Sequence, residues 1–137
     1  MESELTWQEA KAKAQAMERE IAGLIPEDKV AKIEQRETGL MFSCSEEQHT
    51  WDGSTNVTLT KGTEEESILK AIEAHYQDGP FAIKTDFDIV GDYRVQLRSR
   101  DSAESYLFGI DEPGTIHISS GSACFTLPEG VDPGDDF

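Results

Sequence analysis

The chain begins with apolar residues that recur every three or four positions. This spacing places them on one face of an amphipathic helix over residues 5–25. The apolar face consists of Trp7, Ala10, Ala14, Met17, Ile21 and Leu24. Charged residues occupy the opposite side, which we expect to face water: Glu9, Lys11, Lys13, Glu18 and Glu20. Pro26 ends the helix, and Val30 with Ile33 suggests a short second helical turn before Gly39.

Alternation of apolar and polar residues then predicts two strands, at 40–44 and 56–60. We expect the polar residues 45–54 between them to form a loop. The apolar residues that share a face in these strands are Leu40, Phe42 and Cys44, then Val57 and Leu59.

A second helix is predicted to start at Thr63. Thr63 and Glu66 have the spacing of a capping box, and the turn residues 78–80 end the helix. Its buried stripe is predicted to comprise Ile68, Leu69 and Ile72, with His75 or Tyr76.

The rest of the chain alternates as a run of strands, at 81–89, 93–99, 104–110, 115–119 and near 124–127. Two short turns predict the register of the first and last hairpins. The turn at 90–92 sets Ile89 opposite Tyr93 and Asp88 opposite Arg94, and the turn at 112–114 sets Ile110 opposite Ile116 and Phe108 opposite Ile118.

The hairpin around residues 101–103 allows two registers. Simple pairing sets Leu107 opposite Leu97 and puts Tyr106 and Phe108 on the polar face of the sheet. Alternatively, a bulge near the turn changes the phase and brings these aromatic residues into the core. We favour the bulge. The other register would leave an exposed apolar patch on the outer face of the sheet, and such a patch usually marks an interface.

Together these elements predict an α+β fold, in which two helices cover one face of an antiparallel meander sheet. The predicted order is α-β-β-α-β-β-β-β, followed by a final short strand. Residues 1–127 are predicted to form a single domain. Residues 128–137 hold four acids and no base, with two Pro and two Gly, and predict an acidic flexible C-terminal tail.

Composition narrows the function classes. The 137 residues carry 28 acids and 12 bases, which give a net charge of −16. This charge argues against a protein that tracks the phosphate backbone of a nucleic acid. No apolar stretch approaches the roughly 20 residues of a membrane span. Six Phe, three Tyr and two Trp are enough aromatic residues to nucleate a core.

The negative charge is unevenly distributed. Residues 81–109 contain five acids and four bases, so the other 108 residues carry −15. The bases predict a binding face for an acidic or carboxylate-bearing partner, made of Lys84, Arg94, Arg98 and Arg100 with Tyr106. The alternative is that Asp86, Asp88 and Glu104 pair with these bases and contribute only to structure.

No motif predicts a reaction. The three histidines share no local spacing for a metal, and residues 119–122 lack the context of a nucleophile elbow. We therefore expect no catalytic residue, no metal site and no cofactor. An enzyme would need converging titratable groups, for which the candidates are Glu46, His49, His75 and His117.

Cys44 and Cys124 lie in short strand-like segments without the spacing of a zinc or thioredoxin-type motif. They are either two buried small hydrophobic side chains or one disulfide. A disulfide would close a loop of 81 residues, counting both cysteines, and stabilise the fold by roughly 4–5 kcal/mol. It would also indicate an oxidising compartment.

Residues 1–4 are acidic and lead straight into the helical pattern, without the basic and apolar stretches of a signal peptide. Either the protein starts here in the cytoplasm, or a leader has been removed.

A resemblance over residues 5–128 bears on this choice. After the leading helix, it rests on Gly39-Leu40-Met41-Phe42-Ser43-Cys44, Trp51-Asp52-Gly53 and Ser120-Gly121-Ser122-Ala123-Cys124-Phe125. These segments resemble small actinobacterial lipoproteins of unknown function, in which a lipidated or cleaved leader precedes a compact domain. The resemblance implies an exported domain with Cys44 and Cys124 as disulfide partners, and it implies no activity. The leader is the feature that this sequence lacks.

The sequence therefore leads to a non-enzymatic, monomeric domain of an exported, envelope-associated protein that binds an unknown protein or small ligand. A lipid anchor would belong to a leader outside this chain. The alternative is a cytosolic acidic inhibitor or immunity-type protein, which its net charge of −16 would steer toward a basic partner.

Overall fold

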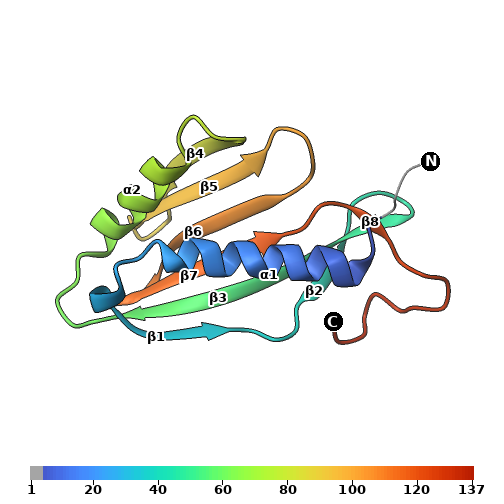
Figure 1. Cartoon of the computed structure of the whole chain (residues 1–137), viewed down its shortest axis with the longest axis horizontal. Helices are drawn as coiled ribbons and strands as arrows, with labels where there is room; N and C mark the ends of the chain where they lie inside the picture. The colour runs from blue at the N-terminus through green and yellow to red at the C-terminus, as the bar shows by residue number, and fades with distance from the viewer. Residues whose placement is uncertain (1–4) are drawn as a thin grey trace.

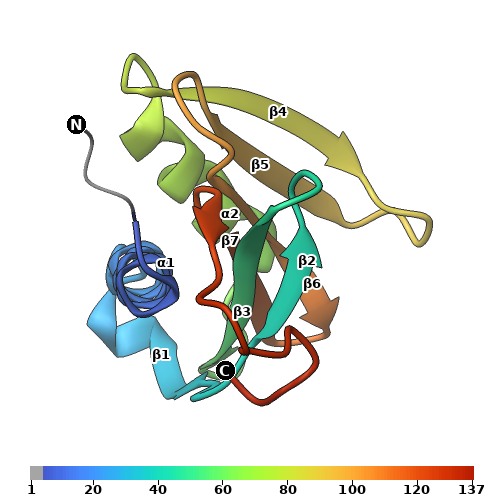
Figure 2. The same ribbon diagram turned by 90° about the vertical axis from the view of Figure 1, so that its right-hand side faces the viewer.

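The computed structural model describes residues 5–137, and both helices lie on the same face of one antiparallel sheet (Figures 1 and 2). The α+β class and the predicted order of elements are confirmed, with one additional strand. The helices are α1 (Trp7–Gly23) and α2 (Glu65–Tyr76). The strands are β1 (Val30–Gln35), β2 (Leu40–Ser43), β3 (Gln48–Leu59), β4 (Phe81–Phe87), β5 (Tyr93–Ser99), β6 (Ser105–Glu112), β7 (Thr115–Gly121) and β8 (Phe125–Thr126). Residues 1–4, which the sequence assigns to the domain, lie outside the described residues.

The sheet combines a meander with a long central strand. Its order is β1-β3-β7-β6-β5-β4, and the short strands β2 and β8 pair with β3 as well. The strands from β4 to β7 follow one another as neighbours, whereas β7 then pairs with β3 from the first half of the chain. The strand β3 therefore joins the two halves of the fold.

The helix α1 starts at a capping box that Thr6 and Glu9 form. The Thr6 hydroxyl accepts from the Glu9 N–H at 3.1 Å, and the Glu9 carboxylate accepts from the Thr6 N–H at 2.9 Å. The predicted apolar stripe is buried at Ala10, Ala14 and Ile21. Glu18, which we expected in water, is fully buried and is a correction to the sequence analysis. Four residues after Ala14 and three before Ile21, it belongs to the stripe itself.

Two segments differ from the sequence-based expectation. Where a second helical turn was expected around Val30 and Ile33, a short 3₁₀ helix (Glu27–Lys29) leads into β1. This strand lies at the edge of the sheet, with a partner strand on one side only, and Ile33 is 49 % exposed. An edge strand of this kind does not require a strong apolar alternation in its sequence. Residues 48–54, expected in a loop, form the first part of β3. Their side chains are mostly polar, and Trp51 is the fully buried one among them, so the segment lacks the apolar alternation of a predicted strand.

The N-cap of helix α2 lies one residue after Thr63, the predicted N-cap. Glu64 is the N-cap without a side-chain capping bond, and the Thr63 hydroxyl lies 2.9 Å from that of Thr60 instead. The predicted capping box is therefore wrong. The buried stripe is confirmed, with Tyr76 rather than His75 at its end.

The β4–β5 hairpin has a longer loop than predicted. Asp86 pairs with Arg94, so the loop comprises residues 88–92, and the predicted pairs of Asp88 with Arg94 and of Ile89 with Tyr93 are wrong by two positions. The Asp88 carboxylate closes this loop by accepting two of its main-chain N–H groups, at 2.9 and 3.0 Å.

The β5–β6 hairpin has the phase that we favoured. Leu97 pairs with Tyr106 and Val95 with Phe108, and all four side chains are buried. The change of phase comes from a four-residue loop (100–103) with no register shift between these strands, so the expected bulge is not its cause. The predicted β6–β7 register is confirmed.

Two hydrophobic clusters lie between the sheet and the helices. The larger one contains the buried side chains of α2 and of β3 to β7, together with Ile21 and Ala22 of α1. The smaller one contains Ala10 and Ala14 of α1 with three aromatic residues. These are Trp51, Phe125 and Phe137. The helix α1 thus contacts both clusters.

The C-terminal segment returns toward α1 (Figure 1). It contains no helix or strand, yet Phe137 is only 5 % exposed and packs edge-on against Trp7, with ring centroids 4.9 Å apart. The main-chain oxygen of Phe137 accepts from Lys11 Nζ at 2.6 Å and from Trp51 Nε1 at 3.2 Å. This packing differs from the free tail that the composition of residues 128–137 predicts, because an aromatic residue at position 137 completes the smaller cluster.

Cys44 and Cys124 form a disulfide, with their Cα atoms 6.1 Å apart. The bridge connects the turn between β2 and β3 to the residue that precedes β8. Of the two possibilities that the sequence left open, the structure has the bridge. Within residues 5–137, neither helix has the length and hydropathy needed to cross a membrane.

Candidate functional site

The sheet face opposite the helices carries the candidate site, and we call it the open face. Its residues alternate with the buried ones, and the register aligns them in rows across the strands. One row runs Ala82, Arg98, Ser105, Gly121, Asp52, Leu40, and the next runs Lys84, Gln96, Leu107, Ser119, Ser54. A third runs Asp86, Arg94, Gly109, His117, Asn56, Glu34.

Side-chain size varies along these rows. The central strands β6 and β7 contribute the small residues Ser105, Gly109, Ser119 and Gly121 along with Leu107 and His117. Three hollows of about 140, 190 and 380 Å³ lie along these rows. The first and second share the residues Arg94 and Leu107, and the second and third share Ser119, so the three hollows are neighbours on the open face.

Three of the five residues predicted for a binding face lie on the open face. They are Lys84, Arg94 and Arg98. Arg94 forms a bidentate ion pair with Asp86, at 3.0 Å from Nε and 2.8 Å from Nη2, and this hydrogen bonding lowers the pKa of Asp86. Within residues 5–137, Lys84 and Arg98 make no ion pair with a carboxylate.

Tyr106 and Arg100 do not belong to this face, which corrects the prediction. Tyr106 is 1 % exposed on the helix side, because the phase of the β5–β6 hairpin turns it inward. Its hydroxyl donates to Glu104 at 2.9 Å, and burial raises its pKa. Arg100 follows β5 and donates to the main-chain oxygen of Phe81 at 3.4 Å, where it lines a hollow beside α2 with Glu73.

The acids that were expected to neutralise the bases are used in different ways. Only Asp86 pairs with an arginine of the open face. Asp88 closes its own loop, and Glu104 pairs with Lys13 of α1 at 3.2 Å. Because Glu104 also accepts from Tyr106, its hydrogen bonds outweigh the effect of burial and lower its pKa.

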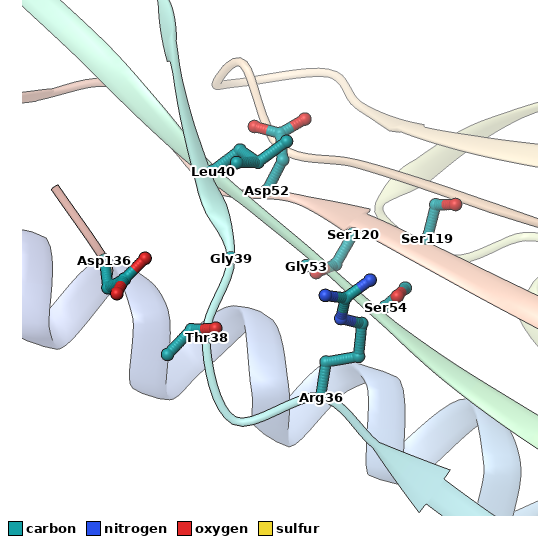
Figure 3. A pocket seen from close by; sticks show the side chains of 10 residues that line it. All are labelled: Arg36, Thr38, Gly39, Leu40, Asp52, Gly53, Ser54, Ser119, Ser120 and Asp136. Atoms are coloured by element: carbon teal, nitrogen blue, oxygen red, sulfur yellow. The ribbon is translucent and has the colours of Figure 1, made fainter. Parts of the chain in front are cut away.

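The largest of the three hollows lies where β1 gives way to β2 along the edge of β3, and we call it the Arg36 hollow (Figure 3). The lining residues are Arg36, Thr38, Gly39, Leu40, Asp52, Gly53, Ser54, Ser119, Ser120 and Asp136. The chain crosses between the two strands at residues 36–39, and the Arg36 N–H donates to the Ser54 carbonyl at 3.0 Å. The hollow is therefore made by an interruption in strand pairing.

Two glycines permit this interruption. A side chain at Gly39 or Gly53 would collide with the Trp51 indole, which is fully buried beneath both. Trp51 therefore lies directly beneath the hollow and supports it. The main-chain N–H of Trp51 donates to Ser122 Oγ at 2.8 Å. The sequence signal for this site is Trp51-Asp52-Gly53, in which a large aromatic residue stands two positions before a glycine.

Glu18 lies directly behind the hollow, on the helix side of the sheet. It accepts from Thr55 Oγ1 at 2.6 Å, from Gln35 Nε2 at 3.3 Å and from the Ser120 hydroxyl. Within residues 5–137, no basic side chain forms an ion pair with it. On the opposite face, burial raises the pKa of Asp52, whose carboxylate accepts from Thr50 at 2.8 Å. The carboxyl groups of Glu18 and Asp52 therefore lie on opposite faces of β3 at the Arg36 hollow, and neither forms an ion pair within residues 5–137.

The histidines do not converge. His117 Nδ1 lies 2.6 Å from the amide oxygen of Asn56. His49 lies seven residues before Asn56 on the same strand, which is about 23 Å away, and its buried Nδ1 has no partner within the described chain. His75 belongs to α2, on the other side of the sheet. Residues 5–137 contain no group of three or more acids, His and Cys arranged to hold a metal ion.

No protein-family model, curated protein or solved structure matches this chain. Its role is therefore inferred from the residues themselves.

Proposed function

We propose that this protein is a non-enzymatic binding domain of an exported, envelope-associated protein, and that the open face is its contact surface. The observation that carries the proposal is the set of three neighbouring hollows on the open face. Helices fill the other face of the sheet with side chains, whereas this face is left uncovered and indented. Concave surfaces with a few convergent polar groups are the usual sites of ligand contact.

Charge supports the same surface. The strands of the open face hold four bases and five acids, so their balance is −1 in a protein whose net charge is −16. The bases are Lys32, Lys84, Arg94 and Arg98, and the acids are Glu34, Asp52 and Asp86 with Asp111 and Glu112 at the end of β6. A partner with carboxylates would meet far less repulsion here than elsewhere on the protein, and Lys84 and Arg98 are available to pair with it.

The disulfide supports export. Disulfides persist in oxidising compartments and are rare in the cytosol. Cys44 and Cys124 are joined, as the resemblance to exported lipoproteins implies for its members. A free-thiol count under denaturing, non-reducing conditions tests this part of the proposal. Two titratable thiols in the protein isolated from its own envelope fraction would contradict it.

A photo-crosslinking pair tests the contact surface in cells of the source organism. A benzophenone amino acid replaces Gln96 at the centre of the open face, and in the control protein it replaces Ala71 on the exposed side of α2. We expect a discrete adduct from position 96 only. The double variant Lys84→Glu/Arg98→Glu should abolish it, whereas Lys29→Glu/Lys61→Glu, with the same change in charge, should not.

Equal adducts from positions 96 and 71, or an adduct that survives the reversal of Lys84 and Arg98, would refute the open face as the contact surface. The cytosolic inhibitor of a basic partner remains the second proposal, which the net charge of −16 favours. Its association rate would fall steeply with salt. An association rate that does not change with salt would count against it.

A further inference from the structure

Within the open face, the Arg36 hollow has a feature that the other hollows lack. It places an unpaired cation and unpaired carboxylates in one cavity, whereas Arg94 in the neighbouring hollows is already paired with Asp86. Arg36 makes no ion pair with any carboxylate of residues 5–137, and only its main chain takes part in hydrogen bonds there. A ligand would therefore not have to displace a carboxylate from this guanidinium.

One end of the hollow offers donors to an anion. The Arg36 guanidinium points toward β3, where Ser54 and Ser119 stand side by side as register partners (Figure 3). Neither hydroxyl has a hydrogen-bond partner within the described chain. A guanidinium with two free hydroxyls matches a carboxylate, which accepts up to four hydrogen bonds in one plane.

The other end offers acceptors to a cation. The Asp52 carboxylate lies beside Leu40, and Asp136 lines the same hollow near Thr38 (Figure 3). Burial raises the pKa of Asp52, so this carboxylate would gain from a positive group placed against it.

The spacing between the two ends selects the ligand. Asp52 and Ser54 are two residues apart on one strand and face the same side, so their Cα atoms are separated by about 7 Å. Two side chains so placed can both contact one small molecule that carries an ammonium and a carboxylate on the same carbon atom. A hollow of about 380 Å³ is at the small end of ligand pockets.

We propose that the Arg36 hollow binds a free α-amino acid, with its carboxylate on Arg36, Ser54 and Ser119 and its ammonium on Asp52. This inference rests on the proposed binding role and names the ligand class of one hollow. Asp136 lies at the rim and adds a second carboxylate for the ammonium or for a polar side chain.

A titration of the ¹⁵N-labelled chain, followed by NMR, tests the proposal. The probes are L-alanine, L-leucine and L-glutamate, with propionate and L-alaninamide as compounds that each keep one of the two charges. We expect at least one amino acid to shift the amide signals of Gly53, Ser54 and Ser119 saturably. Propionate and alaninamide should bind about tenfold or more weakly, because each loses a charge-assisted contact.

Two variants locate the contacts. Arg36→Gln and Asp52→Asn should each weaken amino acid binding about tenfold or more. Arg100→Gln is the matched control, because it removes an exposed arginine that lies outside both this hollow and the open face. The amide spectra of all three variants also report whether each remains folded.

The proposal is overturned if no amino acid gives saturable shifts, or if propionate or alaninamide binds as tightly as the amino acids. It is also overturned if Arg36→Gln binds as well as the parent chain. These results are independent of the crosslink from position 96, which depends on Lys84 and Arg98. The contact surface and the ligand can therefore fail separately.

Discussion

Removal of the disulfide should destabilise this protein strongly, and the structure makes the test a clean one. Cys44 is exposed and Cys124 is half-buried, so Cys44→Ser/Cys124→Ser loses the bridge with little loss of packing. Each single variant loses the same bridge and should therefore behave like the double variant. The wild-type protein after chemical reduction provides the third measure.

The magnitude follows from the loop that the bridge closes. The two cysteines are 80 positions apart, which makes a loop of 81 residues when both are counted. Chain-entropy arithmetic for a loop of this length gives about 4.5 kcal/mol at 25 °C. Since single domains are stable by only ~5–15 kcal/mol, the variant should be close to the limit of folding. The bridged segment contains β3, α2 and the whole β4–β7 meander.

Guanidinium chloride denaturation followed by tryptophan fluorescence measures the loss. Trp51 is fully buried in the smaller cluster and Trp7 packs on Phe137 in the same cluster, so both report on the region around the bridge. We expect the midpoint to fall and the slope of the free energy of unfolding to rise, because an unbridged unfolded chain exposes more surface.

A loss below about 1 kcal/mol with an unchanged slope would refute this reasoning. It would mean that the unfolded chain stays compact around this region without the bridge. A large loss in the double variant without the same loss in the reduced wild type would assign the effect to the serines instead.

Three further predictions concern the core and the hollow. Gly53→Ala should cost about 1–3 kcal/mol, because the new methyl group collides with the buried Trp51 indole, and a loss below about 0.5 kcal/mol in the same denaturation assay would contradict it. Burial raises the pKa of Tyr76 and Tyr106, so the native state keeps protons that the unfolded state loses near pH 10, and stability should fall above that pH. Tyr76→Phe and Tyr106→Phe should each flatten this fall in denaturation measured between about pH 9 and 12, and an unchanged slope would count against the argument. Burial likewise raises the pKa of Asp52 above 3.8, so the free energy of unfolding should fall as the pH rises from that value toward the raised pKa. Asp52→Asn should remove this part of the pH dependence, and the same pH dependence in the variant would contradict the prediction.

The elements with strong periodicity could be predicted from the sequence. The stripe of Ile68, Leu69 and Ile72 defined α2, and the alternation after Phe81 defined the meander. Ile110 and Ile116 fixed the β6–β7 register because a tight turn leaves little choice of pairing. The edge strand β1 was missed, since a strand with one neighbour needs few apolar residues.

The candidate site was only partly predictable. Lys84, Arg94 and Arg98 were placed on one face correctly, because side chains two residues apart in a strand share a face. Tyr106 was placed on the binding face, which holds only for the register that we did not favour; the four-residue loop between β5 and β6 turns it inward. The Arg36 hollow depends on where β1 leaves β3 and β2 joins it, which is a long-range property of the sheet.

The buried Glu18 has a consequence for the position of α1 along its own axis. Ala14 and Ala22 lie one turn to either side of it, so the small apolar residues alone would allow the helix to slide by one turn, about 5.4 Å. A slide of that length would take Glu18 away from Thr55 and Ser120 and leave a buried carboxylate without donors. The hydrogen bonds of Glu18 thus favour one axial position of the helix over the others. Because Ser120 also lines the Arg36 hollow, the same hydrogen bonds fix the position of helix α1 relative to that hollow.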